Sequence, residues 1–198
     1  MTERELTAKA EQRERTRAAI LDSACRLLRE RGIGGARVAD VMSGIGLTVG
    51  GFYAHFASKE ALVDETIRRT AEAMRGKLFA RIVDKPPEAR AEVVMKRYLS
   101  APHRDTPETG CPLPAIAGEV STSKPEHRGV VAEQIGVLAE ELARLLVMTP
   151  STASAKRSSA LAMIALMYGG LSLSRAVRGT ELSDEILKAC RSFGKSER

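Results

Sequence analysis

Apolar residues recur at helical spacing along most of this chain. The first run predicts a helix that ends near residue 31, where Gly32 can terminate it. Its apolar positions are Ile20, Leu21, Ala24, Leu27 and Leu28. Similar runs follow towards the C-terminus, with no pair of strand-like segments, no hairpin signal and no internal repeat. The pattern therefore predicts an all-α protein with about nine helices.

Two short helices are predicted over residues 37–45 and 48–56, and Gly46 lies in the turn between them. Phe52 and Phe56 are four residues apart, so they share one helical face and can pack on the preceding helices. Two short helices joined by a glycine turn are typical of a helix-turn-helix. In that motif the second helix enters the major groove of DNA while the first crosses the backbone.

The start of the second short helix has the composition of a DNA-reading element. Thr48 is placed to cap the helix through its hydroxyl, and Thr48 and Val49 lead it into the groove. Gly50 and Gly51 lie in its first turn, where bulk would hold the backbone away from DNA. Exposed N–H groups at this end can also hold a phosphate.

The residues that follow are candidates for contact with DNA or for capping the next helix. Tyr53 and His55 are expected to point away from the packed face, each offering a ring with a hydrogen-bonding tip. Ser58 is predicted to cap the next, long helix. Lys59 begins that helix and is placed to contact a second phosphate.

The segment GLTVGGFYAHFASKEALV and the helical stripe before it resemble the N-terminal domain of TetR-type transcriptional repressors over residues 13–64. The resemblance implies a helix-turn-helix DNA-binding domain over residues 1–60 and an effector-binding and dimerisation domain over residues 61–198. It also implies a homodimer that binds a double-stranded DNA operator and is released by a small-molecule effector. The DNA-contacting positions implied are Thr48, Val49, Gly50, Tyr53, His55 and Lys59, to which the close-approach argument adds Gly51.

Arg37 departs from the pattern of this family. Members often place Thr or Ser at this position to cap the second helix, and an arginine has no oxygen with which to do so. The start of that helix is therefore expected to be looser. A contact from Arg37 to a DNA phosphate is the alternative role.

The remainder of the chain predicts further helices separated by clear breaks. The segment DKPPE, residues 84–88, ends the long helix, and a helix follows over residues 90–100. Residues 101–114 read as a loop rich in proline and turn formers. A long amphipathic helix is predicted over residues 129–148 and a break over residues 149–154.

The last two helices, residues 155–177 and 182–193, are candidates for a dimer interface. The first is apolar nearly all round, which one face of a monomer cannot satisfy, and its small residues permit close helix packing. A four-helix bundle across a two-fold axis would make the operator roughly palindromic. The interface residues expected are Leu161, Ile164, Tyr168, Leu182, Ile186 and Phe193.

The segment TGCPLPAIAGEV resembles a branch of the family with a Gly-Cys segment at the start of a ligand-domain helix. Some members of that branch sense electrophiles or oxidants through the cysteine. Pro112 is suited to the first helical position, which makes Cys111 the cap, and a thiol at a helix N-terminus has a lowered pKa. His103 and Arg104 are expected to add positive charge. The alternatives are that Cys111 is a packing residue beside a pocket, and that the effector is a reversibly bound hydrophobic ligand.

Composition narrows the classes of function. The net charge of +6 suits a polyanionic partner, but residues 1–60 carry ten basic and eight acidic side chains, so the charge does not locate DNA binding. This even distribution argues against a non-specific architectural DNA protein. The three cysteines and three histidines show neither disulfide nor metal spacing, and no phosphate loop or nucleophile motif supports an enzyme. We expect no cofactor and no metal.

The N-terminus is highly charged and does not read as a signal peptide. The longest uncharged apolar stretch, residues 158–174, is shorter than the roughly 20 residues that a spanning helix needs. It is better interpreted as a buried helix. The sequence therefore predicts a cytoplasmic protein without a membrane partner.

Overall fold

The computed structural model describes residues 3–145 and 152–196. Within them the chain forms nine α-helices and four short 3-10 helices and no strand, which confirms the all-α prediction. The α-helices are α1 (Glu3–Gly35), α2 (Val38–Ser43), α3 (Lys59–Leu78), α4 (Pro87–Tyr98), α5 (Ala101–Asp105), α6 (Leu113–Thr122), α7 (Arg128–Leu145), α8 (Ala153–Ala176) and α9 (Glu181–Ser196). The 3-10 helices are η1 (Val49–Ala54), η2 (Ile82–Asp84), η3 (Pro107–Thr109) and η4 (Pro125–His127).

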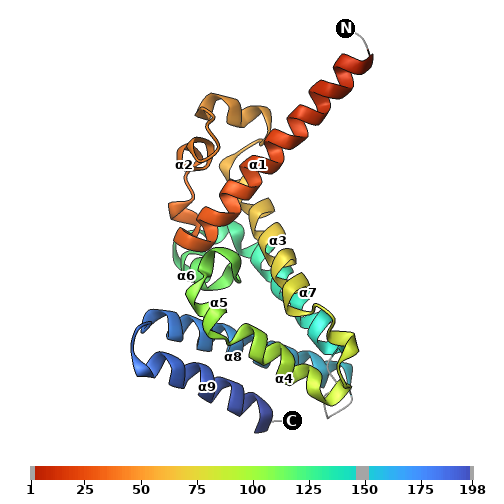
Figure 1. Ribbon diagram of the computed structural model, residues 1–198, viewed down its shortest axis with the longest axis vertical. Coiled ribbons are helices and arrows are strands. Elements are labelled where there is room, and N and C mark those ends of the chain that lie inside the picture. Colours follow the sequence, from red (N-terminus) through yellow and green to blue (C-terminus); the bar gives the residue numbers. More distant parts are fainter. Residues whose placement is uncertain (1–2, 146–151, 197–198) are drawn as a thin grey trace.

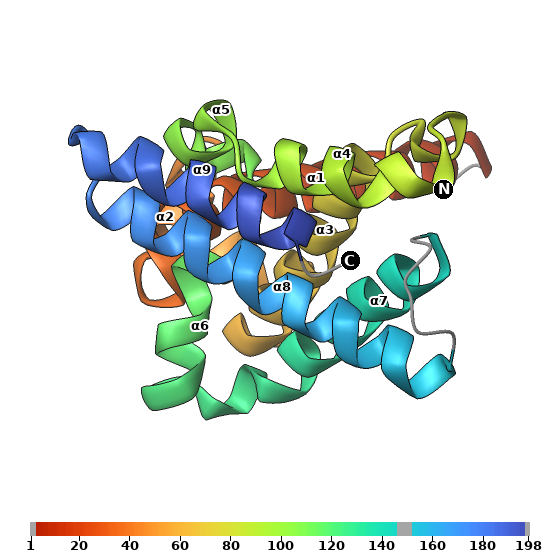
Figure 2. The same ribbon diagram turned by 90° about the horizontal axis from the view of Figure 1, so that it is seen from below.

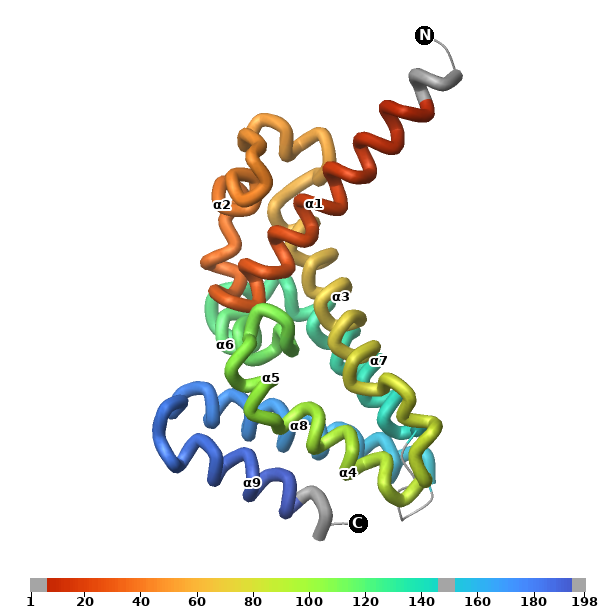
Figure 3. The backbone as a smooth tube through the Cα atoms, viewed as in Figure 1, coloured from red at the N-terminus to blue at the C-terminus, as the bar shows by residue number. Residues whose placement is uncertain are grey.

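The molecule is elongated, with the first helices at one end and the last two at the other (Figure 1). We call α1, α2 and η1 the head, and the group formed by α4, α7, α8 and α9 the body. Helix α3 begins in the head and runs towards the body beside α7, as the backbone tube shows (Figure 3). Helix α3 is therefore a continuous connection between the head and the body.

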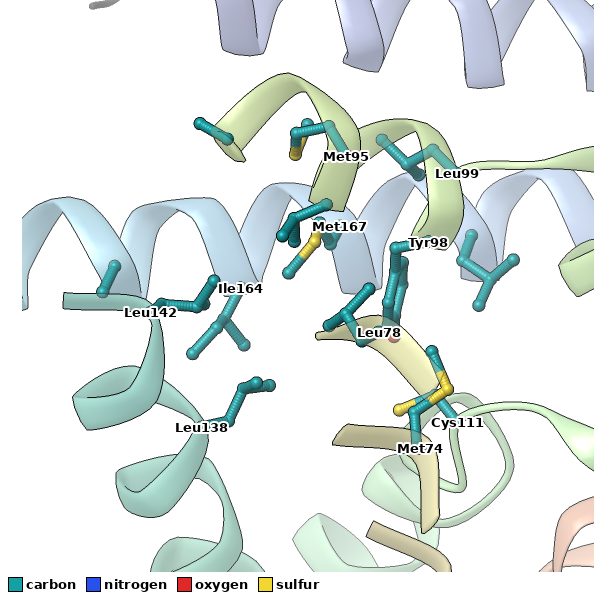
Figure 4. Packing of buried hydrophobic residues seen from close by; sticks show 14 of the residues in the cluster. Met74, Leu78, Met95, Tyr98, Leu99, Cys111, Leu138, Leu142, Ile164 and Met167 are labelled. Carbon is teal, nitrogen blue, oxygen red and sulfur yellow. The ribbon is translucent and has the colours of Figure 1, made fainter. Parts of the chain in front are cut away.

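Buried apolar side chains gather in three clusters along this axis. The head cluster holds Phe52 and Phe56, and Leu62 at the start of α3 also belongs to it. A middle cluster joins α1 to α3, α6 and α7. The body cluster packs α3, α4, α7, α8 and α9 together, with Met74 of α3 and Tyr98 of α4 close to one another (Figure 4). Since α3 contributes to all three clusters, the domain boundary after residue 60 stays a prediction.

Helix α1 is kinked at Gly32, which has a φ of 71°. This left-handed conformation is one that glycine adopts at little cost, so the sequence-predicted end of the helix at this residue is close to what is observed. One short helical turn, residues 33–35, follows the kink before the chain enters α2.

The predicted loop over residues 101–114 was wrong in part, because it contains α5 and η3. The hydroxyl of Ser100 accepts a hydrogen bond from the N–H of His103 at 3.3 Å and so caps α5. Pro102 lies in the first turn, where its missing N–H costs nothing. A capping serine followed by a proline was a signal in the sequence that the loop assignment overlooked.

Helices α7 and α8 agree with the apolar pattern that predicted them. Residues 146–148 of the predicted helix and residues 149–151 of the predicted break lie outside the described residues. The hydroxyl of Thr152 accepts a hydrogen bond from the N–H of Ala155 at 3.2 Å and caps α8. The α8–α9 pair packs closely, since a Cβ added at Gly170 would lie 2.8 Å from the sulfur of Cys190.

Helix α8 is, among the described helices, the one long and apolar enough to cross a membrane, with a mean hydropathy of 1.2. Length and composition alone also admit the core helices of soluble proteins. Here α8 packs on α7 and on α9. Seen from the body end, α8 and α9 form the outermost layer (Figure 2).

Candidate nucleic-acid interface and effector cavity

The turn between α2 and η1 is built around Gly46. This residue has a φ of 73°, and no atom lies within 4 Å of the position that a Cβ would occupy. The backbone conformation alone therefore requires glycine here. The N–H of Leu47 donates to the carbonyl of Met42 at 3.0 Å and closes the turn. The two elements are thus held in the arrangement of a helix-turn-helix.

Phe52 and Phe56 fasten η1 to the rest of the head. Both side chains are buried, and their rings stack with centroids 5.7 Å apart. The guanidinium of Arg17 on α1 lies over the ring of Phe56, 4.7 Å from its centroid. The packing role that their spacing predicted is confirmed, although the element is a 3-10 helix rather than an α-helix.

The opposite side of η1 is open to solvent. Thr48, Val49, Gly50, Gly51 and Tyr53 are all exposed, and Tyr53 is 69% exposed. A Cβ at Gly50 or Gly51 would meet nothing closer than 3.9 Å and 3.8 Å respectively. Neither residue has a positive φ. The fold itself therefore gives no reason for glycine at either position.

Two expected roles at this surface differ in the structure. The Thr48 hydroxyl makes no capping hydrogen bond, although its backbone has the extended conformation of a cap, so the predicted cap is wrong. His55 is half-buried, and its Nδ1 is shielded from solvent without a hydrogen-bond partner among the described residues. One edge of the His55 ring therefore faces inward rather than away from the head.

Arg37 and Lys59 flank the exposed residues at the starts of α2 and α3. Arg37 makes no capping bond, as expected, and its Nε instead donates to Oδ2 of Asp40 at 2.7 Å. Lys59 follows Ser58, whose hydroxyl accepts from the N–H of Ala61 at 3.1 Å. The predicted Ser58 cap is confirmed. Arg37 is exposed, and Lys59, the first residue of α3, is half-buried.

Arg13 and Arg17 of α1 also hold the head together, a role that was not predicted from the sequence. Nη2 of Arg13 donates to the carbonyl of Ala54 at 2.9 Å and ties α1 to the end of η1. Arg17 forms a two-contact ion pair with Glu65 of α3, at 2.7 Å and 2.5 Å. Arg13 and Arg17 are four residues apart and therefore share a face of α1. This spacing was visible in the sequence, but their partners were not.

Cys111 lies in a buried setting that differs from the expected one. Pro112 occupies the N-cap position and α6 begins at Leu113, so Cys111 precedes the cap. The side chain is buried beside Met74 and Tyr98 (Figure 4). Burial raises the pKa of the Cys111 thiol, and the Tyr98 hydroxyl and the N–H of Leu113 offset this only in part. The expected lowering of the thiol pKa was therefore wrong.

His103 also lacks the charge that was assigned to it. Burial lowers the pKa of His103 to about 4, so the ring is neutral near pH 7. Its Nδ1 lies 2.6 Å from the carbonyl of Tyr98, and its Nε2 accepts from the N–H of Cys111 at 2.9 Å. These two contacts fix Nδ1 as the protonated nitrogen. His103 thus holds the Cys111 backbone in place and adds no positive charge to the thiol.

Arg104 is likewise directed away from Cys111. Its guanidinium donates to Asp184 at 2.6 Å, to Asp105 at 2.8 Å and to the hydroxyl of Ser183 at 2.8 Å. The residue therefore ties α5 to the start of α9. Its predicted contribution to a thiolate was wrong, because its charge is already compensated.

A small apolar cavity of about 30 Å³ lies next to Cys111. Its walls come mainly from α3 and α7, and include Ile67, Met74, Tyr98 and Leu138. The volume is about that of one water molecule in the liquid. A larger molecule can enter only if the lining side chains, or α3 and α7, move apart.

Glu119 of α6 joins this region to the head. Its carboxylate accepts hydrogen bonds from the N–H of Ile33 at 2.9 Å and from the N–H of Gly34 at 2.7 Å. A Cβ at Gly32 would lie 1.9 Å from Oε1 of Glu119. The turn after the α1 kink is therefore held by a carboxylate from an element 85 residues later in the chain.

Within the described residues, no group of three or more His, Cys, Asp or Glu side chains is gathered as a metal site would require. The fold and the exposed surface of η1 together define the class of helix-turn-helix transcriptional regulators. Residues 20–66 match the family model of bacterial regulatory proteins of the tetR family. The N-terminal part of the chain therefore carries the helix-turn-helix domain that is typical of this family.

Curated relatives match in the same N-terminal region. The chain is 37% identical over 75 residues to the HTH-type transcriptional repressor KstR2 of Rhodococcus jostii, covering 38% of this chain and 36% of that protein. It is 42% identical over 52 residues to KstR2 of Mycobacterium tuberculosis, covering 26% of each. The chain therefore matches about a third or less of the length of these curated relatives.

Solved structures match over nearly the whole chain. A TetR-family transcriptional regulator from Cytophaga hutchinsonii is 22% identical with a TM-score of 0.78, covering 94% of this chain and 96% of that one. A TetR regulator from Chloroflexus aurantiacus is 23% identical with a TM-score of 0.77, covering 94% and 95%. At these identities the similarity establishes the fold of the part beyond the helix-turn-helix, and leaves its ligand open.

Proposed function

We propose that the protein is a repressor that binds a palindromic DNA operator as a homodimer and is released by a small-molecule effector. The observation that carries this proposal is the two-sided character of η1. One side is fastened by the buried rings of Phe52 and Phe56, and the other exposes Thr48, Tyr53 and two glycines that the fold does not require.

The proposed DNA contacts follow from this surface. Gly50 and Gly51 allow the backbone of η1 to approach the groove, and Tyr53 extends beside them. Lys59 and Arg37 are proposed to contact phosphates, Arg37 in competition with Asp40. Because two early positions have no side chain, we infer that phosphate contacts and DNA shape contribute more to recognition than direct base contacts.

The proposed dimer interface is the outer layer of α8 and α9. Leu161, Leu182 and Phe193 are exposed there, at 39%, 51% and 58%, and Tyr168 and Ile186 are half-buried. Ile164 is different, because it is 6% exposed and packs within the body cluster of its own chain. We therefore leave Ile164 out of the proposed interface. Leu173, which is 60% exposed on α8, extends the same apolar surface.

For the effector we favour a reversibly bound apolar molecule over thiol chemistry. The cavity beside Cys111 has apolar walls, and the thiol is buried with a raised pKa, whereas the attacking species in thiol chemistry is the thiolate. Ile67, Met74 and Leu78 of α3 line this cavity. An effector that enlarges the cavity would displace α3 and change the spacing of the two heads of the dimer. Such coupling requires two states with different affinities for DNA.

Titration of labelled DNA duplexes tests the DNA-binding part. The wild type is expected to bind a duplex from the region upstream of its own gene more tightly than a random duplex at matched salt. Lys59→Ala is expected to weaken binding and to reduce the slope of log affinity against log salt by about 0.9, the value for one lost phosphate contact. Lys156→Ala on α8 makes the same charge change away from the head and is the control.

Equal affinity for both duplexes would overturn the proposal in favour of a non-specific DNA-binding protein. Tyr53→Ala should weaken operator binding without altering the oligomeric state. A Tyr53→Ala protein that binds as tightly as the wild type would remove this residue from the interface.

Alkylation by iodoacetamide tests the effector part. In the native protein at pH 7, half-buried Cys190 is expected to be labelled well before Cys111, as measured by peptide mass spectrometry. Cys111 is expected to react at the rate of an ordinary thiol only after unfolding in urea. Rapid native labelling of Cys111, with loss of operator binding that Cys111→Ser prevents, would instead establish thiol sensing.

A further inference from the structure

A second hollow, larger and of opposite character to the cavity beside Cys111, lies where the head meets the body. Its volume is about 310 Å³. It is open to solvent and is lined by residues of α1, α5, η3, α6 and α8 and of the segment after α8, among them four arginines. They are Arg29, Arg104, Arg175 and Arg178.

Three of these arginines have no ion-pair partner among the described residues. Arg104 is compensated by Asp105 and Asp184, but Arg29, Arg175 and Arg178 make no salt bridge. The acidic lining residue, Glu30, lies 3.5 Å from Arg26 on its own helix. The residues that line the hollow therefore carry more positive than negative charge.

Two of these guanidinium groups are also partly withdrawn from water. Burial lowers the pKa of Arg29 and of Arg175, and the charge of Glu108 compensates Arg175 only in part. Arg175 donates to the carbonyls of His103 at 2.7 Å and Arg104 at 3.3 Å, whereas Arg29 reaches only carbonyls at 3.3 Å and 3.4 Å. Desolvating a cation without an anionic partner is unfavourable, so this arrangement implies a partner from outside the chain.

Two buried polar atoms without a hydrogen-bond partner belong to residues beside the same hollow. Nε of Arg29 and the hydroxyl oxygen of Ser172 are buried and have no hydrogen-bond partner among the described residues. Both residues line the hollow. Buried polar atoms are rarely left unpaired in folded proteins, and a bound ion or water is one of the explanations for such an atom.

We propose that this hollow binds a small molecule through a phosphate or pyrophosphate group held by Arg29, Ser172, Arg175 and Arg178. Guanidinium groups match the oxygens of phosphate in paired hydrogen bonds, and a serine hydroxyl supplies a further donor. Three guanidinium groups without a salt bridge suit a group with several negative charges better than one carboxylate does. The site is separate from the apolar cavity beside Cys111, with which it shares no lining residue.

Isothermal titration calorimetry of the DNA-free, full-length protein with sodium pyrophosphate at constant ionic strength tests this site. Saturable binding of one pyrophosphate per chain is expected, with weaker binding of succinate. Arg178→Gln changes an exposed side chain and is expected to weaken pyrophosphate on the order of tenfold, the effect of one lost charge-assisted hydrogen bond. Arg29→Gln, with its folding checked by circular dichroism, is expected to weaken it at least as much.

Lys188→Gln is the matched control. Lys188 lies in a smaller basic hollow of about 120 Å³ beside Lys96 and Arg191, and its loss makes the same change in net charge. Its pyrophosphate affinity is expected to equal that of the wild type. Absence of saturable binding, equal losses in Arg178→Gln and Lys188→Gln, or equal affinity for succinate would each overturn the proposal.

Discussion

The side chain of Glu119 accepts a hydrogen bond from the backbone N–H of Gly34 at 2.7 Å, and so α6 holds the turn that leads into the helix-turn-helix. Glu119→Ala removes this acceptor and also the one for Ile33. Because hydrogen bonds to a charged group are worth about 1.5–3 kcal/mol each and this site is only half-buried, we expect the free energy of unfolding to fall by about 2 kcal/mol.

Urea unfolding measures this change, and hydrogen exchange of a peptide over residues 31–36 is expected to become faster in Glu119→Ala. Glu72→Ala, at an exposed position of α3, is the control and should alter neither quantity. Unchanged exchange at residues 33 and 34 in Glu119→Ala would show that the carboxylate does not hold the turn.

Gly46 and Gly32 both have left-handed backbones, so alanine at these two positions separates the cost of backbone strain from the cost of side-chain collision. Gly46 has a φ of 73° and an open surrounding, so Gly46→Ala is expected to cost about 1 kcal/mol from backbone strain alone. Gly32 has a φ of 71°, but its added Cβ would also collide with Glu119 and with the carbonyl of Ala115, at 1.9 Å and 2.9 Å. Gly32→Ala should therefore cost clearly more than Gly46→Ala. Equal midpoints in parallel urea titrations would contradict the close contact.

The proposed homodimer through the outer layer of α8 and α9 can be tested by a substitution in that layer. A carboxylate at Leu182, which is 51% exposed, would be desolvated in the proposed dimer, so Leu182→Glu is expected to dissociate it. Analytical ultracentrifugation should show the mass fall from twice 21.4 kDa to 21.4 kDa. Val83→Glu, at a position 65% exposed on η2, is the control and should leave the dimer intact. A Leu182→Glu protein that stays dimeric would place the interface elsewhere.

The neutral ring of His103 predicts a stability that depends on pH. The folded chain takes up this proton only near pH 4, whereas an unfolded histidine takes it up near pH 6.5. The unfolded state therefore binds more protons between these values, and stability falls as the pH is lowered from 6.5 to 4. Protonation of His103 alone lowers the free energy of unfolding by up to about 3 kcal/mol over this range of pH. His103→Gln should flatten the fall, as measured by urea unfolding at several pH values, and an equally steep fall would contradict the assignment.

The local parts of the fold could be predicted because short spacings determine them. The four-residue interval between Phe52 and Phe56 predicted that they share one buried face. Ser58, whose hydroxyl caps α3, predicted where that helix begins. The left-handed residue at Gly32 was also signalled by its place after an apolar stripe. Each of these depends on residues within one or two helical turns.

What the sequence could not predict depends on burial and on distant partners. The acidity of Cys111 was argued from its nearness to a helix start, but its pKa follows from enclosure by α3, α4 and α6. His103 and Arg104 were counted as charges, whereas one is neutralised by burial and the other is paired with Asp184 on α9. The acceptor for Gly34 lies 85 residues away, beyond the reach of any local pattern.

At Gly50 and Gly51, selection for stability and selection for close approach to DNA favour different residues. The space around each would admit a methyl group, and alanine lowers the conformational entropy of an unfolded chain relative to glycine. Selection for stability alone would therefore tend to replace both residues. Under the proposed function, η1 is a region whose stability is lower than the fold permits because close approach to DNA requires a backbone without side chains.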